Sequence, residues 1–275
     1  MRFNTEQKKD IEKHARNLWG KDLHSKKSAP IHHIKLKKVF YTQWHQYFRG
    51  NLLEIGCGSG SDLAVFSKDD RLSSITAIDI GDNILELSKK YSKVSNIIID
   101  NGNALDLAFE SSSFDVIYSY GVFHHTAEPM ICIEESYRVL KKNGAMFLYL
   151  YSAHEDLPLK RIGIFFESLI MKTIRLFPYI VQSYICKILS PVCWIFFSVP
   201  AKFLYFIDRT SLAAKFPFHF ATHPFSLIGD LKDRLMSPVN FRFTKYEMEQ
   251  MLSFASFSSF EVIKNSSGLY IFAKK

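Results

Sequence analysis

Five short apolar runs follow one another between residues 52 and 150, and helix-like or turn-like segments separate them. The runs span residues 52–55, 74–78, 96–99, 114–119 and 145–150. This alternation is typical of parallel β-α-β units, because strands covered on both faces are apolar along their whole length. Helices are expected over 60–68, 82–91 and 130–141. Asn143-Gly144 is expected to end the last of these helices before the fifth strand.

The alternation of strand-like and helix-like segments stops for about 90 residues after 151 and returns near the C-terminus. Thr244 and Glu247 have the spacing of a capping box, which predicts the start of a helix. Strand-like runs follow at 260–263 and 269–273, with Asn265 to Gly268 between them as a hairpin turn. The sheet is therefore predicted to end in an antiparallel pair.

A glycine loop follows the first predicted strand, with Gly56, Gly58 and Gly60 at alternate positions. Glycines allow positive φ angles and let a ligand approach the backbone. Asp79 ends the second predicted strand, where a carboxylate can bind both hydroxyls of a ribose or, alternatively, cap the next helix. The loop lacks the third glycine, three residues after the second, that dinucleotide sites use. A nucleoside ligand without phosphates is therefore favoured.

At this point the sequence resembles the class I S-adenosylmethionine-dependent methyltransferases of the methyltransferase domain 11 type. The resemblance covers about 52–150, with a looser similarity over 230–275. Six blocks carry it in order: Leu52–Gly60, Ala77–Ile80, Gly102–Phe109, Ser113–Ser119, Val122–His125 and Glu135–Gly144. It implies an α/β fold with a three-layer, Rossmann-like, seven-stranded and mostly parallel sheet that has an antiparallel C-terminal hairpin.

Four segments are expected on this basis. An N-terminal helical lid covers 1–50, with helices over 5–19 and 39–48, and the cofactor-binding core covers 51–150. A hydrophobic helical insertion after the fifth strand covers 151–229, and 230–275 completes the core.

The resemblance also implies roles for single residues. Gly56, Gly58 and Gly60 would line the methionine part of S-adenosylmethionine, and Glu54 would support the loop or the amino group. Asp79 would bind the ribose, whereas Asn103 stands where the family usually has Asp beside adenine. The remaining cofactor-binding residues are expected to be Cys57, Ile80, Ala104 and Tyr120. No metal is expected.

His124 and His125 lie just beyond the fourth strand and are the candidates for a catalytic base, with a purely structural role as the alternative. Enzymes that methylate amino groups of bases carry Asn or Asp, two prolines and an aromatic residue there. Ser119 to Phe123 lacks this pattern, which argues against DNA and, more weakly, against RNA as the substrate.

The net charge of +8 arises within residues 1–50, which hold 12 basic and 4 acidic side chains, while 51–150 is acidic. Nucleic acid is therefore an unlikely partner, although the basic segment keeps RNA as an alternative. The four cysteines form no metal-binding or disulfide pattern, and the N-terminus lacks the apolar core of a secretory signal. A cytoplasmic location is expected.

The segment 160–207 is rich in aromatic residues and carries scattered cations. Its longest stretch without a charged residue runs from Ile188 to Ala201 and contains Pro191 and Pro200, so a covering or interfacial element is expected rather than a membrane crossing. Contact with a membrane surface and packing as a substrate cap are both open.

Four residues are expected to meet the substrate: Tyr41 and Trp44 by closing the site, and Asn240 and Arg242 from the stretch before the last helix. The sequence thus predicts an S-adenosylmethionine-dependent methyltransferase acting on a small molecule, with lipid-linked and saccharide-derived acceptors as candidates. The alternatives are a tRNA or rRNA methyltransferase and a non-catalytic, cofactor-binding or membrane-associated scaffold.

Overall fold

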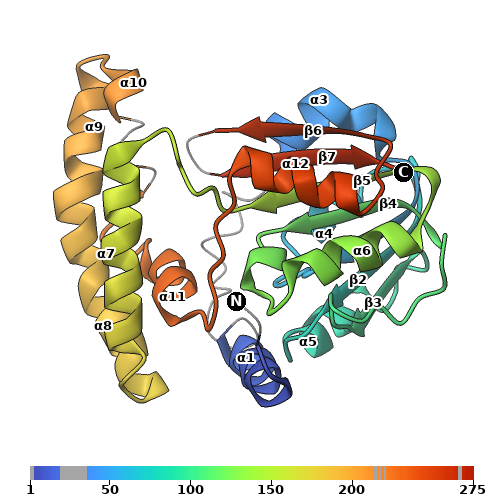
Figure 1. Ribbon diagram of the computed structural model, residues 1–275, viewed down its shortest axis with the longest axis horizontal. Coiled ribbons are helices and arrows are strands. Elements are labelled where there is room, and N and C mark those ends of the chain that lie inside the picture. Colours follow the sequence, from blue (N-terminus) through green and yellow to red (C-terminus); the bar gives the residue numbers. More distant parts are fainter. Residues whose placement is uncertain (1–2, 19–35, 214–215, 217, 220, 266–267) are drawn as a thin grey trace. The chain divides into compact units, whose positions relative to one another are not determined.

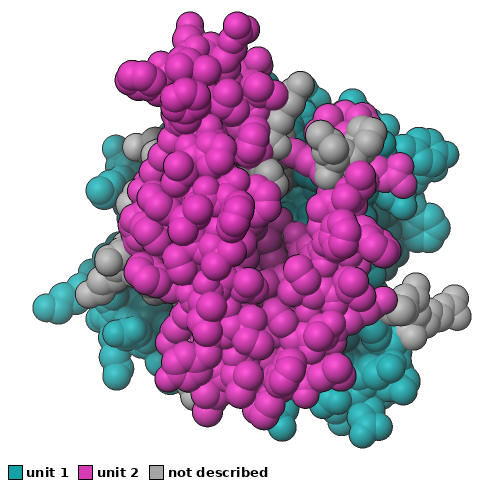
Figure 2. Space-filling view, turned by 90° about the vertical axis from the view of Figure 1, so that its left-hand side faces the viewer, with its two compact units in different colours: residues 1–24, 29–155, 238–275 teal, residues 25–28, 156–237 magenta. Residues whose placement is uncertain are grey.

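The computed structural model describes residues 3–18, 36–213, 216, 218–219, 221–265 and 268–275 (Figure 1). The chain divides into two compact units, which are coloured separately in Figure 2. Unit 1 comprises residues 1–24, 29–155 and 238–275, and unit 2 comprises 25–28 and 156–237.

Unit 1 is built on one seven-stranded sheet with the order β3-β2-β1-β4-β5-β7-β6 (Figure 1). Strands β1 to β5 pair in parallel, whereas β7 pairs antiparallel with both β5 and β6. The predicted fold class is thereby confirmed. The strands are β1 (Gly50–Ile55), β2 (Leu72–Asp79), β3 (Ile97–Asn101), β4 (Phe114–Tyr120), β5 (Leu140–Leu150), β6 (Ser259–Lys264) and β7 (Leu269–Lys274).

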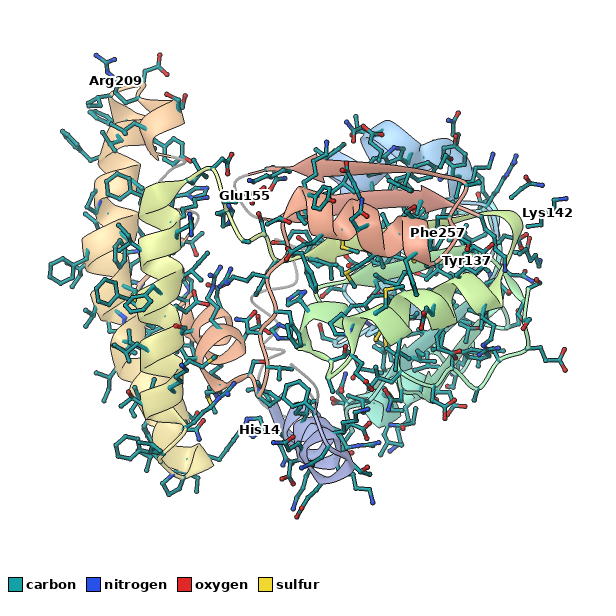
Figure 3. All side chains as sticks on the ribbon, in the orientation of Figure 1. His14, Tyr137, Lys142, Glu155, Arg209 and Phe257 are labelled. Atoms are coloured by element: carbon teal, nitrogen blue, oxygen red, sulfur yellow. The ribbon has the colours of Figure 1, made fainter. Side chains whose placement is uncertain are left out.

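Helices cover both faces of this sheet, as buried apolar runs require. One face packs against α4 (Leu63–Phe66) and α5 (Ile84–Tyr91) through residues such as Phe66 and Leu87. The opposite face packs against α6 (Pro129–Val139) and α12 (Lys245–Phe254). Tyr137 of α6 meets Phe257, just after α12, with its ring edge-to-face at 5.1 Å (Figure 3).

The capping box at the start of α12 is present, since the Thr244 hydroxyl accepts from the Glu247 N–H and the Glu247 carboxylate accepts from the Thr244 N–H. The expected end of α6 at Asn143-Gly144 is wrong. The helix ends at Val139, and β5 begins at Leu140 and runs through both residues. Asn143 has φ 64°, and the register between β4 and β5 shifts there, so the dipeptide forms an irregularity inside the strand.

The described parts of the N-terminal segment have two different positions in unit 1. Helix α1 (Thr5–Asn17) packs Ile11 against Ala127 and Val239. The helical stretch formed by η2 (Leu36–Tyr41), α3 (Thr42–Trp44) and η3 (His45–Tyr47) instead packs on the α4 and α5 face of the sheet. Residues 20–35, between the two predicted helices 5–19 and 39–48, lie outside the described residues.

Unit 2 is helical. Helices α7 (Pro158–Ile174) and α8 (Tyr179–Cys193) both contact α11 (Ile228–Met236). Helix α8 continues through η5 (Trp194–Ser198) into α9 (Val199–Phe206), and the short α10 (Thr210–Ala213) follows. Pro191 and Pro200 therefore do not interrupt the helix, contrary to what they suggested in the sequence. The continuous stretch Tyr179–Phe206 is long and apolar enough to cross a membrane by length and composition.

Candidate functional site

The candidate site lies where the carboxyl ends of β1, β2, β3 and β4 meet. The helix after β1 packs on one face of the sheet and the helix after β4 on the other. β1 and β4 are neighbours, so the chain directions diverge between them. Such a switch point opens a crevice at the carboxyl edge, where ligands bind in open α/β sheets.

The glycine loop after β1 is fixed by backbone hydrogen bonds. Gly56 and Cys57 both donate to the carbonyl oxygen of Ile78, at 2.7 and 3.1 Å, and Gly60 donates to Cys57 at 2.8 Å. Gly56 has φ 80°, and a Cβ atom at this position would collide with Val122, so the turn requires glycine. These three amides bond within the protein and are therefore not available to a phosphate group.

Asp79 ends β2 as predicted and holds the glycine loop. Its buried carboxylate accepts from the N–H groups of Gly58 and Gly81, each at 2.8 Å. Helix α5 begins at Ile84, with Asn83 at its N-cap, so Asp79 is not the helix cap that the sequence left open. Each carboxylate oxygen has a second lone pair and can therefore still accept a ribose hydroxyl.

Two buried carboxyl groups lie beside the loop. Glu54 is 3% exposed, and its Oε2 atom has no hydrogen-bond partner in the described part of the chain. Burial, together with Asp62 and Asp79, raises the pKa of Glu54 well above its usual range. Burial also raises the pKa of Asp62 to about 6, although a hydrogen bond from the Tyr118 hydroxyl at 2.8 Å opposes the shift. This pair forms a site suited to a cation.

Asn103 opens the loop after β3, and both ends of its amide are engaged. Its oxygen accepts from the Leu105 N–H at 3.0 Å, and its nitrogen donates to Glu12 of α1 at 2.9 Å. Neighbouring Ala104 is buried. The contact with Glu12 brings the N-terminal helix to the edge where the adenine was expected.

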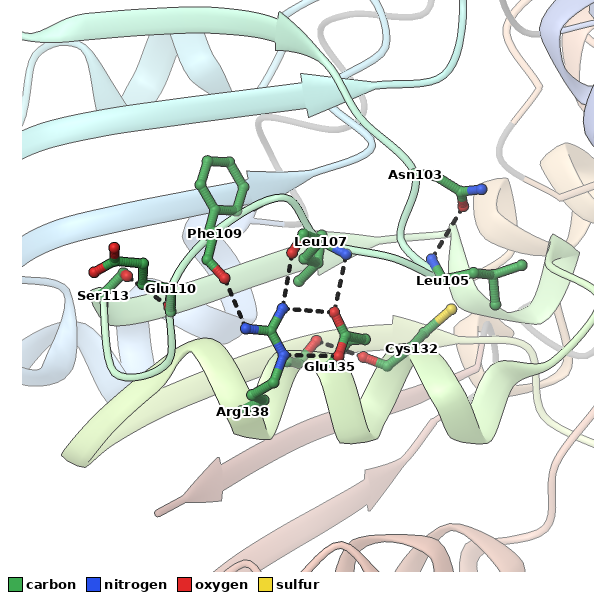
Figure 4. Close-up of polar contacts among 10 residues, drawn as sticks. Asn103, Leu105, Leu107, Phe109, Glu110, Ser113, Cys132, Glu135 and Arg138 are labelled. Atoms are coloured by element: carbon green, nitrogen blue, oxygen red, sulfur yellow. Dashed lines mark hydrogen bonds and ion pairs between the residues drawn. The ribbon is translucent and has the colours of Figure 1, made fainter.

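A clamp on α6 holds the chain that follows Asn103 (Figure 4). Arg138 donates to the carbonyl oxygens of Leu107 and Phe109 at 2.7 and 2.6 Å. It also donates twice to Glu135, which accepts from the Leu107 N–H at 2.9 Å. Two charged side chains thus fix three backbone groups of one loop, and such charge-assisted bonds are strong.

Tyr120 ends β4 and stacks on Tyr149 of β5, with ring centroids 4.3 Å apart. Gly121 follows with φ 78°, and a Cβ atom there would meet nothing within 4 Å.

The remaining two predicted cofactor-binding residues lie beside Asp79 and in the glycine loop. Ile80 is half-buried directly after Asp79. Burial raises the pKa of the Cys57 thiol well above its usual range, so this thiol stays protonated at neutral pH.

His124 and His125 are both buried beyond β4. The Nδ1 atom of His125 lies 3.0 Å from the carbonyl oxygen of Val239 and can donate a hydrogen bond to it. The His124 ring lies 4.1 Å from the Tyr151 ring, and its carbonyl accepts from the Phe241 N–H at 2.9 Å. The two histidines therefore attach residues 239–241 to the end of β4.

Asn240 and Arg242 reach the same edge of unit 1. Phe243 donates to Tyr151 at 3.0 Å and accepts from Ala153 at 2.9 Å, so this stretch runs beside the end of β5. The Arg242 guanidinium lies 5.2 Å from the centre of the Tyr151 ring. The Oδ1 atom of Asn240 is buried without a partner in the described part of the chain. Both residues thus lie near the histidine pair.

The expectation that Tyr41 and Trp44 close the site is wrong. The Tyr41 hydroxyl donates to Asp69, just before β2, whereas Asp79 ends that strand about 23 Å away. Trp44 is buried, stacks on Phe272 and donates to Glu261 of β6 at 3.3 Å. Tyr41 thus lies at the amino edge of the sheet, and Trp44 is buried on the face that α4 and α5 cover.

Sequence reasoning missed the roles of Asp62, Arg138 and Tyr151. Asp62 could have been found, because it follows the third glycine of the loop by two residues. Arg138 lies in a block that carried the family resemblance, but its bonds to loop carbonyls have no sequence signal. Tyr151 comes directly after β5 and is identified only by its contacts.

The geometry agrees with comparisons to known proteins. Residues 53–148 match the family model described as "Methyltransferase domain". A demethylmenaquinone methyltransferase of Staphylococcus aureus strain MRSA252 is 31% identical over 108 residues, which cover 38% of this chain and 44% of the relative. The match thus spans less than half the length of the curated relative. Residues 53–148 thus match the methyltransferase domain family that the sequence motifs predicted.

Solved structures with low sequence identity also match the chain. The YcgJ protein of Bacillus subtilis is 16% identical, with a TM-score of 0.47 over 85% of this chain and 71% of that one. A methyltransferase of Methanosarcina mazei is 20% identical, with a TM-score of 0.47 over 84% of this chain and 95% of that one.

Proposed function

We propose that this protein binds S-adenosylmethionine at the carboxyl edge of β1 to β4 and transfers its methyl group to a small-molecule acceptor. The observation that carries the proposal is the buried Glu54 and Asp62 pair beside a glycine loop that Asp79 holds in place. The cofactor's ammonium group supplies the N–H donors that the unpartnered carboxyl oxygens lack. The residues present therefore fit the group.

Each part of the site would bind one group of the cofactor. Glu54 and Asp62 would accept from the ammonium group, and Asp79 would accept from the two ribose hydroxyls while it holds Gly58. The backbone of Asn103 and Ala104 would meet the adenine. The cofactor supplies an activated methyl group when bound, so alignment of the acceptor accounts for much of the rate.

The acceptor is expected where Tyr120, His124, His125, Asn240 and Arg242 converge beyond β4 and β5. His125 would act as the general base for a hydroxyl acceptor: its imidazole would take the hydroxyl proton and then release it to solvent. The relatives' name supports a small-molecule acceptor, since it names demethylmenaquinone. We propose lipid-linked and saccharide-derived molecules as the candidates.

Calorimetry with S-adenosylhomocysteine tests cofactor binding. Asp79→Ala should weaken binding by at least about a hundredfold, because it removes the ribose acceptor and releases Gly58. Asp70→Ala is the matched control, since Asp70 is exposed before the start of the same strand and should bind like the wild type. No binding by the wild type, or equal binding by both variants, would contradict the proposal.

The acceptor can be found by incubating the protein with S-adenosylmethionine labelled in its methyl group and with cell extracts divided into lipid and aqueous fractions. Label should move from the cofactor to a small molecule in one fraction, and Asp79→Ala should prevent this. Label that is recovered only in RNA purified from the aqueous fraction would support the RNA alternative instead.

A further inference from the structure

Unit 2 exposes a concentration of apolar side chains that unit 1 does not share. Of the 26 large apolar side chains that are exposed among the described residues, 19 lie between Ile162 and Ile207. An ordinary monomer keeps its largest apolar patch to about 300–600 Å². We propose that the outer face of α7, α8, η5 and α9 binds the surface of a lipid bilayer that contains anionic lipids.

The long helix 179–206 exposes apolar side chains and buries small or polar ones, the reverse of a surface helix in a water-soluble protein. Large apolar side chains are exposed at helical spacing along its whole length, over about 42 Å. The exposed stripe consists of Ile180, Tyr184, Ile188, Val192, Ile195, Val199, Phe203 and Phe206. The buried residues are the small or polar Gln182, Cys186, Ser190, Ser198 and Ala201. A helix that faces water would bury the first set and expose the second.

This orientation is fixed by hydrogen bonds inside unit 2. Ser190 donates to the carbonyl of Pro224 at 2.6 Å, and Ser198 donates to that of Phe218 at 2.8 Å. Gln182 donates to the carbonyl of Phe177 at 2.8 Å. Rotating the helix to bury its apolar stripe would break the bonds to Pro224 and Phe218. Small and polar contacts between helices, with large apolar residues outside, are typical of helices in lipid.

Helix α7 has the same arrangement. Phe165, Phe166 and Leu169 are exposed, while Glu167 is turned inward to Arg234 of α11 at 3.3 Å. Arg234 also pairs with Asp230 at 3.0 Å. Because the inner side of α7 carries charges bound by α11, lipid cannot surround the helix. Unit 2 is therefore suited to lie in one leaflet, with the outer face of α7, α8, η5 and α9 toward the lipid, and not to span the bilayer.

The positive charge of unit 2 favours an anionic bilayer, rather than a second copy of the chain, as the partner of this apolar face. Residues 156–237 hold ten basic and five acidic side chains. Lys172 of α7, Lys187 of α8 and Lys202 of α9 are exposed. Lys187 lies 4.8 Å from the centre of the Tyr184 ring, and Lys202 lies 5.4 Å from that of Trp194. Two copies would bring these cations together, whereas anionic headgroups attract them. Lysine stems and aromatic rings are suited to the headgroup region.

Vesicle flotation of the full chain tests the proposal. The protein should float with vesicles of phosphatidylcholine and phosphatidylglycerol, and less with phosphatidylcholine alone. Replacing three outward residues (Ile188→Ser, Phe196→Ser and Phe203→Ser together) should weaken binding at least about tenfold. Leu85→Ser with Phe254→Ser is the matched control, because both residues are exposed apolar side chains of unit 1.

A second variant tests the cations. Lys172→Gln, Lys187→Gln and Lys202→Gln together should remove the preference for phosphatidylglycerol and flatten the salt dependence. The proposal is overturned if the wild type does not float, if the unit 1 control loses binding equally, or if light scattering shows a dimer that only the serine variant dissociates. None of these readouts depends on methyl transfer, so this proposal and the proposed function can fail separately.

Discussion

The candidate site gives up local stability at Glu54 and Asp62. A buried carboxylate without enough hydrogen bonds is costly, and both side chains are buried while an oxygen of each has no partner in the described part of the chain. Tyr118 offsets part of this cost for Asp62 through its hydroxyl. Such uncompensated groups are expected where a ligand completes the set of contacts.

Asp62→Asn should stabilise the protein at neutral pH. The pKa of Asp62 rises from 3.8 to about 6 on folding. The folded state therefore holds a proton that the unfolded state has lost, and stability falls as pH rises from about 4 to 6. The full difference is about 3 kcal/mol. Asparagine keeps an acceptor for Tyr118, so thermal unfolding at pH 7.5 should occur several degrees higher.

Asp70→Asn is the control for the lost charge, because Asp70 is exposed, and it should leave the unfolding temperature unchanged. Wild type and Asp62→Asn should become equally stable below about pH 4. The same variant should bind S-adenosylhomocysteine more weakly, since the ammonium loses a carboxylate. If Asp62→Asn is destabilised at pH 7.5, burial does not dominate the energetics of Asp62.

The elements that hold the site were predictable where their signal is periodic. The strand positions followed from apolar runs, and Thr244 to Glu247 predicted the start of α12. The irregularity at Asn143 was not predictable, because Asn-Gly before an apolar run is compatible both with the end of a helix and with a bulge in a strand. Tyr41 and Trp44 were misplaced because sequence does not tell which part of a sheet a preceding helix covers.

Arg138→Gln should loosen the loop that begins at Asn103. The change removes the bonds to Leu107 and Phe109 and the pairing with Glu135, which should cost about 2–3 kcal/mol of unfolding free energy. Because this loop would carry the adenine contacts, affinity for S-adenosylhomocysteine should also fall. Denaturant unfolding and calorimetry measure the two effects.

Arg71→Gln separates the effect on binding from a general loss of stability. Arg71 pairs with Asp69 before the start of β2 and donates to the carbonyl of His45 at 2.7 Å. The variant should lose stability but keep its cofactor affinity. Equal losses of affinity in both variants would show that the Arg138 clamp has no special part in the site.

Across the whole molecule, charge and polarity are divided by region. Residues 51–150 are acidic and include the match to the methyltransferase family model, whereas 156–237 are basic and expose many apolar side chains. The sequence located the excess charge and the apolar segment. It did not reveal that the helix 179–206 buries its small polar residues, because that depends on the hydrogen bonds from Ser190 and Ser198 to distant carbonyls.

Stabilisation of the whole protein by S-adenosylhomocysteine should depend on pH. The ligand's ammonium binds ionised carboxylates best, and burial raises the pKa of both Glu54 and Asp62. Lowering the pH through about 6 protonates Asp62, so affinity should fall and the ligand-induced rise in unfolding temperature should shrink. In Asp62→Asn this dependence should weaken. A ligand effect that is the same at pH 5 and pH 8 would contradict the assignment.

The unpartnered oxygen of Glu54 has a consequence for the amount of protein in a cell. The folded chain carries a cost that bound methyl donor would relieve, so the fraction that is open to proteases would depend on how much donor is present. A cell short of methyl donor would degrade this protein sooner, and one with ample donor would retain it. The abundance of the protein would then follow its supply of methyl groups without any regulator.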